Sequence, residues 1–192
     1  MMNYRIMIVD DDPIIRMDLR EMLKEEGCEI VKECRNGEEA VEQCIKLNPD
    51  LVLMDIKMPV LNGLKASKII QEKCNTAILL LTAYSQRELI EKAKDSGVTA
   101  YLVKPVTEAD LFPAIEMAMN QKRKFDSLTE DIRSLKKKME ERRIIEKAKG
   151  KVMAKKKLSE EEAYQWLREQ SMKKRISLKS LSEQILKKQS NT

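Results

Sequence analysis

The 192-residue chain contains no histidine, has one tryptophan, and has aromatic residues at only 4% of its positions. The absence of histidine excludes catalysis by a histidine base and argues against zinc sites. Four cysteines are present without any Cys-x-x-Cys spacing, which is typical of free thiols in a reducing compartment. No window reaches the roughly 18 apolar residues that a membrane-spanning helix needs. These absences predict a cytoplasmic protein with no membrane contact.

Charge is abundant and unevenly divided along the chain, since 36% of the residues are charged. Residues 1–118 carry a net charge of −6, and residues 119–192 carry a net charge of +11. A basic C-terminal third favours a polyanionic partner, although a solvated helix surface accounts for the same composition. The length leaves room for one ordinary domain and a small second one.

Four short apolar runs in the first 118 residues end in polar groups. The runs are residues 6–9, 51–54, 77–81 and 100–103, and the groups that follow them are Asp10-Asp11-Asp12, Asp55, Thr82 and Lys104-Pro105. Such runs are typical of strands buried on both faces of a parallel sheet. Helical segments separate them, including one from Ser85 to Gly97, and residues 29–34 form a more polar strand near a sheet edge. The pattern predicts an α/β fold of five strands and five helices.

Parallel strands present their carboxyl ends at one edge of the sheet, and ligands of such sheets bind there. The four polar groups are therefore expected to meet, which brings carboxylates, a hydroxyl and an ammonium group together. Carboxylate oxygens suit a hard divalent cation, and a lysine ammonium group suits a phosphoryl group. The sequence predicts a site for both.

The same residues form a known pattern. The segments Val9-Asp10-Asp11-Asp12, 53–59, Gly63, Leu81-Thr82-Ala83 and 101–105 resemble the response-regulator receiver domain of two-component signalling, over about residues 4–119. The resemblance implies a flavodoxin-like, five-stranded parallel sheet with strand order 2-1-3-4-5 and helices on both faces. It also implies a sensor histidine kinase as a partner and Asp55 as the phosphorylated residue.

The resemblance further implies roles for the residues around Asp55. Mg²⁺ would be held by Asp10, Asp11, Asp55 and the backbone carbonyl of Lys57. The switch and phosphoryl-binding residues would be Thr82, Tyr101, Lys104 and Pro105, with Thr82 moving toward the phosphoryl group and Tyr101 turning inward. A phosphatase with a similar sheet is the alternative, but it carries a second aspartate where this chain has Lys57. We therefore expect a signalling protein that catalyses only its own phosphorylation and dephosphorylation.

A long helix follows the predicted sheet, because residues 114–157 contain no proline and only Gly150 as an interruption. Apolar residues recur along it at spacings of three and four: Phe125, Leu128, Ile132, Leu135 and Met139. This is a short heptad seam, and it predicts a homodimer that depends on phosphorylation. The alternative is an exposed helix that packs on its own domain.

Two more helices are expected after residue 157. Ser159 and Glu162 have the spacing of a capping box, and Ser177 is positioned to cap the last helix. The predicted inward residues are Ala163, Tyr164, Trp166, Leu167 and Met172 on the first helix and Leu178, Leu181, Ile185 and Leu186 on the second. Together with the end of the long helix they would form a small bundle.

The segments 145–153 and 159–164, with Leu167-Arg168 and Ser171-Met172, resemble the ANTAR domain of RNA-binding transcription antiterminators, over about residues 128–189. The whole chain resembles the ethanolamine-utilisation response-regulator antiterminators. We therefore expect a receiver domain at 1–120 and an ANTAR output domain at 121–192, with a coiled-coil helix at 121–143 and a helical bundle at 144–189. The implied partners are RNA hairpins in a leader transcript.

Candidate RNA-binding residues are the basic side chains of this region and one glycine: Lys147, Lys149, Gly150, Lys151, Lys155, Arg168, Lys173, Lys174 and Arg175. Tyr164 and Trp166 are candidates for stacking on bases, although core positions are the alternative for both. The function expected is that of a phosphorylation-activated transcription antiterminator. Two alternatives stay open, namely a DNA-binding response regulator and a receiver with a protein-interaction module.

Overall fold

The structure is a computed structural model that describes residues 3–83 and 99–187. The helix expected from Ser85 to Gly97 lies outside the described residues. The chain divides into two compact units, Met1–Asp126 and Ser127–Thr192. Within the described ranges, no helix combines the length and the apolar character that crossing a membrane requires.

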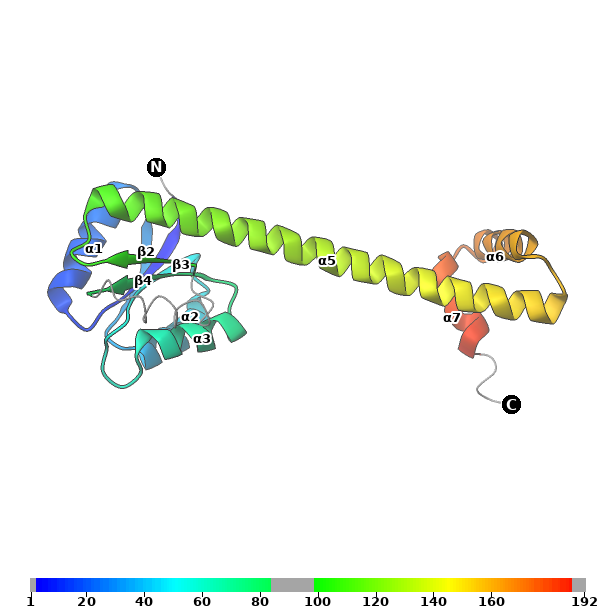
Figure 1. Ribbon diagram of the computed structural model, residues 1–192, viewed down its shortest axis with the longest axis horizontal. Coiled ribbons are helices and arrows are strands. Elements are labelled where there is room, and N and C mark those ends of the chain that lie inside the picture. The colour runs from blue at the N-terminus through cyan, green and yellow to red at the C-terminus, as the bar shows by residue number, and fades with distance from the viewer. Residues whose placement is uncertain (1–2, 84–98, 188–192) are drawn as a thin grey trace. The chain divides into compact units, whose positions relative to one another are not determined.

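The first unit contains the five-stranded parallel sheet that the apolar runs predict (Figure 1). Its strands are β1 (Arg5–Val9), β2 (Glu29–Cys34), β3 (Leu51–Asp55), β4 (Ala77–Thr82) and β5 (Ala100–Val103), and their spatial order is β2-β1-β3-β4-β5. Every residue of β3 and β4 is buried, because helices cover both faces of the sheet. The more polar β2 lies at an edge, as its composition indicates.

Alternation along β1 assigns its side chains to two separate cores. Ile6 and Ile8 pack with residues of α1 (Pro13–Glu25) and of the first turns of α5 (Glu108–Lys156). Met7 and Val9 pack on the other face with α2 (Gly37–Leu47) and α3 (Gly63–Lys73). This period of two is the geometric consequence of a pleated strand. Both faces are therefore closed, and the open positions are left at the strand ends.

Helix α5 begins in the first unit and continues into the second without interruption. Pro113 lies inside its early turns, where few intrahelical N–H bonds are lost. The helix passes Gly150 and ends at Lys156, as the long run of helix-forming residues predicts.

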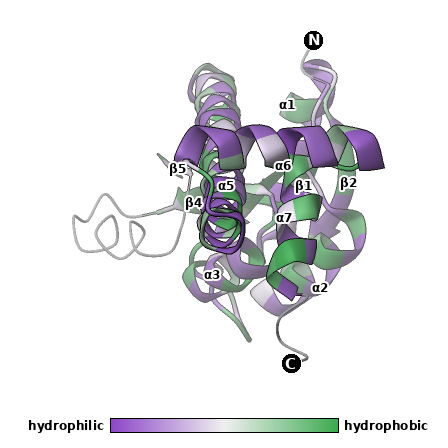
Figure 2. Cartoon of the chain, turned by 90° about the vertical axis from the view of Figure 1, so that its right-hand side faces the viewer, coloured by the Kyte–Doolittle hydropathy of each residue, from purple (hydrophilic) through white to green (hydrophobic). Residues whose placement is uncertain are grey.

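The second unit combines the last part of α5 with α6 (Glu160–Lys174) and α7 (Leu178–Lys187). Its small core consists of Val152, Ala163, Leu167 and Leu181. The predicted capping box is present, with both the Ser159 and the Glu162 side chains bonded to backbone N–H groups. Figure 2 shows α6 as largely hydrophilic, whereas α7 has hydrophobic segments.

Two residues predicted to be buried on α6 are exposed instead. Tyr164 is 45% exposed and Met172 is 60% exposed. The buried row of α6 is Ala163, Leu167 and Ser171, with a spacing of four residues. Tyr164 and Met172 each follow a member of that row by one residue, and a step of one residue turns the side chain by about 100°. The prediction of an inward position was wrong for both residues.

Candidate functional site

The carboxyl ends of four strands meet around a buried group of polar side chains. Asp10 follows β1, Asp55 ends β3, Thr82 ends β4, and all three are at most 6% exposed. Lys104 follows β5, and its Nζ lies 2.6 Å from Asp10 Oδ2 and 2.6 Å from Asp55 Oδ1. The Lys104 N–H also donates to the Thr82 carbonyl at 2.8 Å, which fixes the loop after β5. The sequence-based prediction that these residues converge is consistent with this geometry.

The site contains more negative than positive charge. Burial raises the pKa of the Asp55 carboxyl group, and the neighbouring Asp10 adds to this, although hydrogen bonds from Lys104 and from the Lys57 backbone oppose it. Burial disfavours the charged form of Lys104, but hydrogen bonds to Asp10 and Asp55 outweigh it and raise the pKa of its ammonium group. A single half-buried ammonium group therefore serves two buried carboxylates. Such a site attracts a further cation.

The three consecutive aspartates have three different positions. Asp10 is buried, and its Oδ1 accepts from the Asp12 N–H at 3.0 Å. Asp12 is the N-cap of α1, with its side chain accepting from the Ile14 N–H at 2.8 Å. Asp11 is exposed. Across residues 3–83 and 99–187, no three acidic or thiol side chains lie close enough together to form a metal-binding group by themselves.

The buried pair Asp10 and Asp55 nevertheless fits Mg²⁺. This ion keeps several of its waters and is commonly bound through one or two carboxylates together with substrate phosphate oxygens. Asp10 and Asp55 supply two hard oxygen donors at a site with excess negative charge. The donor set therefore suits Mg²⁺ without a complete protein cage. Asp11 and the Lys57 carbonyl remain predicted ligands.

Two residues that the spacing argument did not single out hold this site in shape. Arg16 Nη1 donates to the carbonyl oxygens of Asp10 and Asp11, at 2.7 and 3.2 Å, and so ties α1 to the loop after β1. Gly63 begins α3 directly against β3, because a Cβ at this position would collide with the Asp55 carbonyl oxygen. The backbone approach at Gly63 positions the peptide group of Asp55. Only the receiver pattern, which includes Gly63, signalled its importance in the sequence.

Replacing Gly63 by alanine is expected to lower the free energy of unfolding by about 2 kcal/mol, because backbone atoms must move to admit the methyl group. Urea unfolding of the full chain measures this. Gly150→Ala is the matched control, since no atom lies within 4 Å of its added Cβ and it should instead stabilise α5 by about 1 kcal/mol. Equal effects of the two substitutions would contradict the close approach at Gly63.

The predicted switch residues are positioned at or beside the same edge. Tyr101 in β5 is exposed, which is the starting position that the switch hypothesis requires. The peptide bond between Lys104 and Pro105 is cis. Thr82 is buried at the end of β4. Movement of Thr82 and Tyr101 remains a prediction.

The RNA-binding candidates of the second unit, which are basic residues and Gly150, differ in their exposure. Exposed residues are Lys147, Gly150, Lys155, Arg168, Lys173, Lys174 and Arg175. Lys151 is half-buried, with Nζ 3.5 Å from the Leu186 carbonyl oxygen. Lys149 is buried and pairs with Glu146 at 2.5 Å and Glu160 at 2.7 Å. Its ion pair with Glu160 ties α5 to α6 within the second unit.

The two aromatic candidates also differ. Trp166 is half-buried in the core of the second unit, and Lys156 Nζ lies 4.8 Å from the centre of its ring. Tyr164 remains open to solvent. Tyr164 is therefore the more exposed of the two candidates for stacking on a nucleic-acid base.

The heptad row on α5 is exposed along its whole length. Phe125, Leu128, Ile132, Leu135 and Met139 have exposed fractions between 53% and 72%. Hydrophobic residues that recur on one side of a helix and remain in contact with water are typical of an interaction surface.

Two family models match the chain. The response regulator receiver domain matches residues 6–116, and the ANTAR domain matches residues 133–186. The chain is 43% identical over 182 residues to the transcriptional regulatory protein PdtaR of Mycobacterium tuberculosis, a match that covers 95% of this chain and 89% of that protein. It is 36% identical over 120 residues to the chemotaxis protein CheY of Bacillus subtilis, covering 62% of this chain and 100% of that one.

Solved structures resemble the first unit. One chain of the CheX-CheY-BeF3-Mg²⁺ complex from Borrelia burgdorferi superimposes with a TM-score of 0.55 and 25% identity, over 58% of this chain and 86% of that chain. The response regulator domain of CheB from Thermotoga maritima gives a TM-score of 0.58 and 30% identity, over 62% of this chain and 98% of that chain.

Proposed function

Since the chain belongs to the response regulators in which a receiver domain precedes an RNA-binding ANTAR domain, we propose that phosphorylation of Asp55 activates it as a transcription antiterminator. A sensor histidine kinase supplies the phosphoryl group. The activated chain forms a homodimer and binds a pair of RNA hairpins in a leader transcript. Stabilised hairpins compete with a terminator and let transcription proceed.

The phosphoryl transfer follows from the positions of Asp55 and Lys104. A carboxylate oxygen of Asp55 attacks phosphorus, the bond from phosphorus to the donor nitrogen or oxygen breaks, and an acyl phosphate forms. Lys104 Nζ, already 2.6 Å from Asp55, pairs with the phosphoryl oxygens as a point charge. Mg²⁺ bound through Asp10 and Asp55 would neutralise charge on the transferring group.

The conformational response starts from the charge of the acyl phosphate. A phosphoryl group adds a charge of about −1.5 to −2 and strong acceptor oxygens. The Thr82 hydroxyl moves to donate to one of these oxygens, and Tyr101 turns into the space that Thr82 leaves. The resulting population shift exposes or aligns the dimer surface.

The output follows from the exposed surfaces of the second unit. The heptad row of α5 pairs with its copy in a second chain, which brings two ANTAR units together. Basic side chains on α5 and α6 then bind hairpin phosphates, and Tyr164 provides a ring for an unstacked loop base. The observation that carries the proposal is the Asp10–Lys104–Asp55 cluster in the same chain as this basic unit.

Binding to RNA and to DNA separates this proposal from its alternatives. We expect the full chain to bind a two-hairpin RNA, selected from a library with randomised loops, more tightly after treatment with acetyl phosphate and Mg²⁺. Duplex DNA of equal length should bind weakly and show no such increase. The measurement is fluorescence anisotropy over a range of salt concentrations, because nucleic-acid affinities depend on salt.

Each other outcome identifies a different function. Tighter binding to duplex DNA would replace the proposal with a DNA-binding response regulator. Binding to neither nucleic acid would favour a protein-interaction module. RNA binding that acetyl phosphate leaves unchanged would retain the RNA-binding output but refute its control by Asp55.

A further inference from the structure

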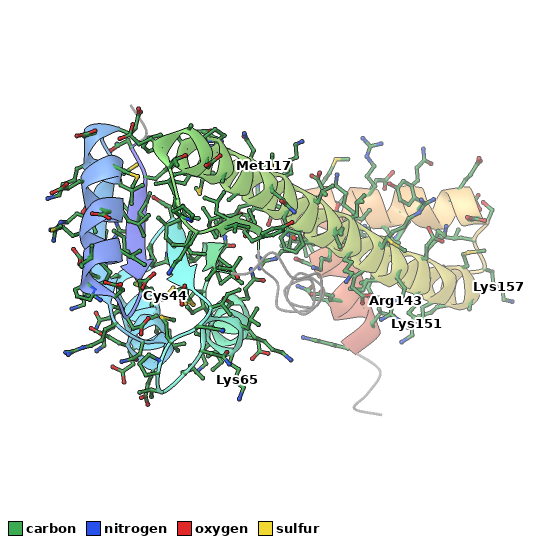
Figure 3. The ribbon with its side chains drawn as sticks, turned by 60° about the vertical axis from the view of Figure 1, so that its left-hand side comes forward. Cys44, Lys65, Met117, Arg143, Lys151 and Lys157 are labelled. Carbon is green, nitrogen blue, oxygen red and sulfur yellow. The ribbon has the colours of Figure 1, made fainter. Side chains whose placement is uncertain are left out.

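One face of α5 in the second unit is basic and lacks large side chains at its middle. Its residues are Arg143, Lys147, Gly150 and Ala154, followed by Lys157 just beyond the end of the helix. The spacings of four and three residues place them on one side of the helix. All five are exposed, and Figure 3 shows Arg143 on this part of α5 and Lys157 just beyond its end. We call this surface the basic face.

The packing of the described residues does not require a glycine at position 150. No atom lies within 4 Å of the place where a Cβ would be. Gly150 has helical conformation, which alanine adopts more favourably, so the residue weakens α5 without an internal benefit. This points to close approach by another molecule.

The charges around Gly150 indicate what that molecule is. Six lysines and no acidic residue lie between Glu146 and Glu160. Glu146, the acidic residue closest to Gly150 in the sequence, is engaged with Lys149. Arg143 pairs with Glu140 at 2.9 Å, but both side chains are exposed, and such a pair yields easily to a stronger partner. A second copy of this face would oppose cation to cation, whereas a polyanion complements it.

Lys157 gives further support. It has a φ of 56°, in the left-handed region that favours glycine, yet the sequence has a lysine there. The chain therefore has glycine inside a helix and a residue with a side chain at a left-handed position, which is the reverse of what backbone propensity favours. Both positions belong to the basic face.

We propose that the sugar–phosphate backbone of the bound RNA lies along the basic face, with Gly150 and Ala154 as the place of closest approach. The cations at Arg143, Lys147 and Lys157 neutralise phosphates on either side of it. The inference rests on the proposed RNA-binding function and deepens it, because it identifies the surface that the backbone contacts.

The test separates the effect of added side-chain volume on RNA affinity from any effect on the stability of the protein. Gly150→Leu and Ala154→Leu add side chains on the basic face, and leucine is a good helix former, so thermal melting should show unchanged or raised stability. RNA affinity should fall by about tenfold or more, because the backbone is displaced from its cations. Gln165→Leu is the control, since Gln165 is exposed on α6 and lies outside this face. The probe is the two-hairpin RNA selected above, and the wild-type chain is measured beside each variant.

The possible results distinguish a failure of the basic-face proposal from a failure of the proposed RNA-binding function. Weaker RNA binding by both leucine variants, with stability retained and Gln165→Leu unaffected, supports the basic face. Unchanged affinity in both variants, while the wild type binds, overturns this inference and leaves the RNA-binding function standing. Absence of RNA binding by the wild type overturns both.

Discussion

Replacing Asp55 by asparagine is expected to abolish phosphoryl transfer to the chain and also to stabilise its fold at neutral pH. Asparagine has no carboxylate to attack phosphorus, so intact-mass measurement after acetyl phosphate treatment should show no added phosphoryl group. The stimulation of RNA binding should disappear with it. The stabilisation has a separate cause: Lys104 would serve Asp10 alone, in place of two buried carboxylates.

The stabilising effect should depend on pH. Burial raises the folded-state pKa of Asp55 above its ordinary value of 3.8, so folding opposes ionisation of this group. The cost is present in full above the folded-state pKa and vanishes as the pH falls toward 3.8. Asp55→Asn should therefore raise the free energy of unfolding at pH 7, and the gain should shrink as the pH falls toward 3.8. Urea unfolding at a series of pH values measures it.

Asp12→Asn is the matched control for both effects. Asp12 is an exposed carboxylate beside the same site, and asparagine caps a helix about as well as aspartate. The control should accept the phosphoryl group and keep its stability. Phosphorylation of the Asp55→Asn variant would show that another residue is the acceptor. A destabilised variant would show that Asp55 and Lys104 form a net favourable pair.

The sheet and its site could be predicted because two strong signals coincide. Continuous apolar runs are short enough to be strands, and parallel strands must end at one edge. Asp10, Asp55 and Lys104 therefore lie together although 94 positions separate the first from the last. Charge alone could not show that a single lysine contacts both carboxylates. That contact depends on the loop after β5, which the Thr82 carbonyl fixes.

The buried side chains of the second unit are harder to predict from the sequence, because this unit has few apolar residues. With a core of four buried hydrophobic residues, the inward row of α6 cannot be found from hydropathy alone, and Tyr164 was placed wrongly for that reason. Lys149 illustrates a related difficulty. A lysine in a basic segment predicts an exposed cation, but Glu146 and Glu160 pair with this one and cover it from solvent. The number of charged residues in a segment does not show which of them form ion pairs with a neighbouring helix.

Replacing Ile132 and Leu135 together by alanine is expected to prevent dimerisation of the phosphorylated chain. Both side chains are more than half exposed in the single chain, so pairing of two helices is what would remove them from water. The dimer loses four such side chains, two from each copy, and its dissociation constant should rise by on the order of a hundredfold or more. Sedimentation velocity over a concentration series, after acetyl phosphate treatment, measures this.

The control is a double replacement by alanine on the other side of the same helix, at Arg133 and Lys137. Both are exposed, and alanine preserves helix propensity at each. This control should dimerise as the wild type does. A dimer that persists in the variant at Ile132 and Leu135 would show that the heptad row is not the interface.

Dimerisation has a second consequence that the same variant tests. Two linked RNA-binding units engage two linked hairpins at a high effective concentration, which raises affinity without new contacts. The monomeric variant should therefore bind a single hairpin as the wild type does, and bind the paired hairpins no more tightly than the single one. If it still favours the paired hairpins, recognition of the pair lies within one ANTAR unit, and the heptad row serves another purpose. If its affinity for a single hairpin also falls, the row itself contributes to the RNA surface.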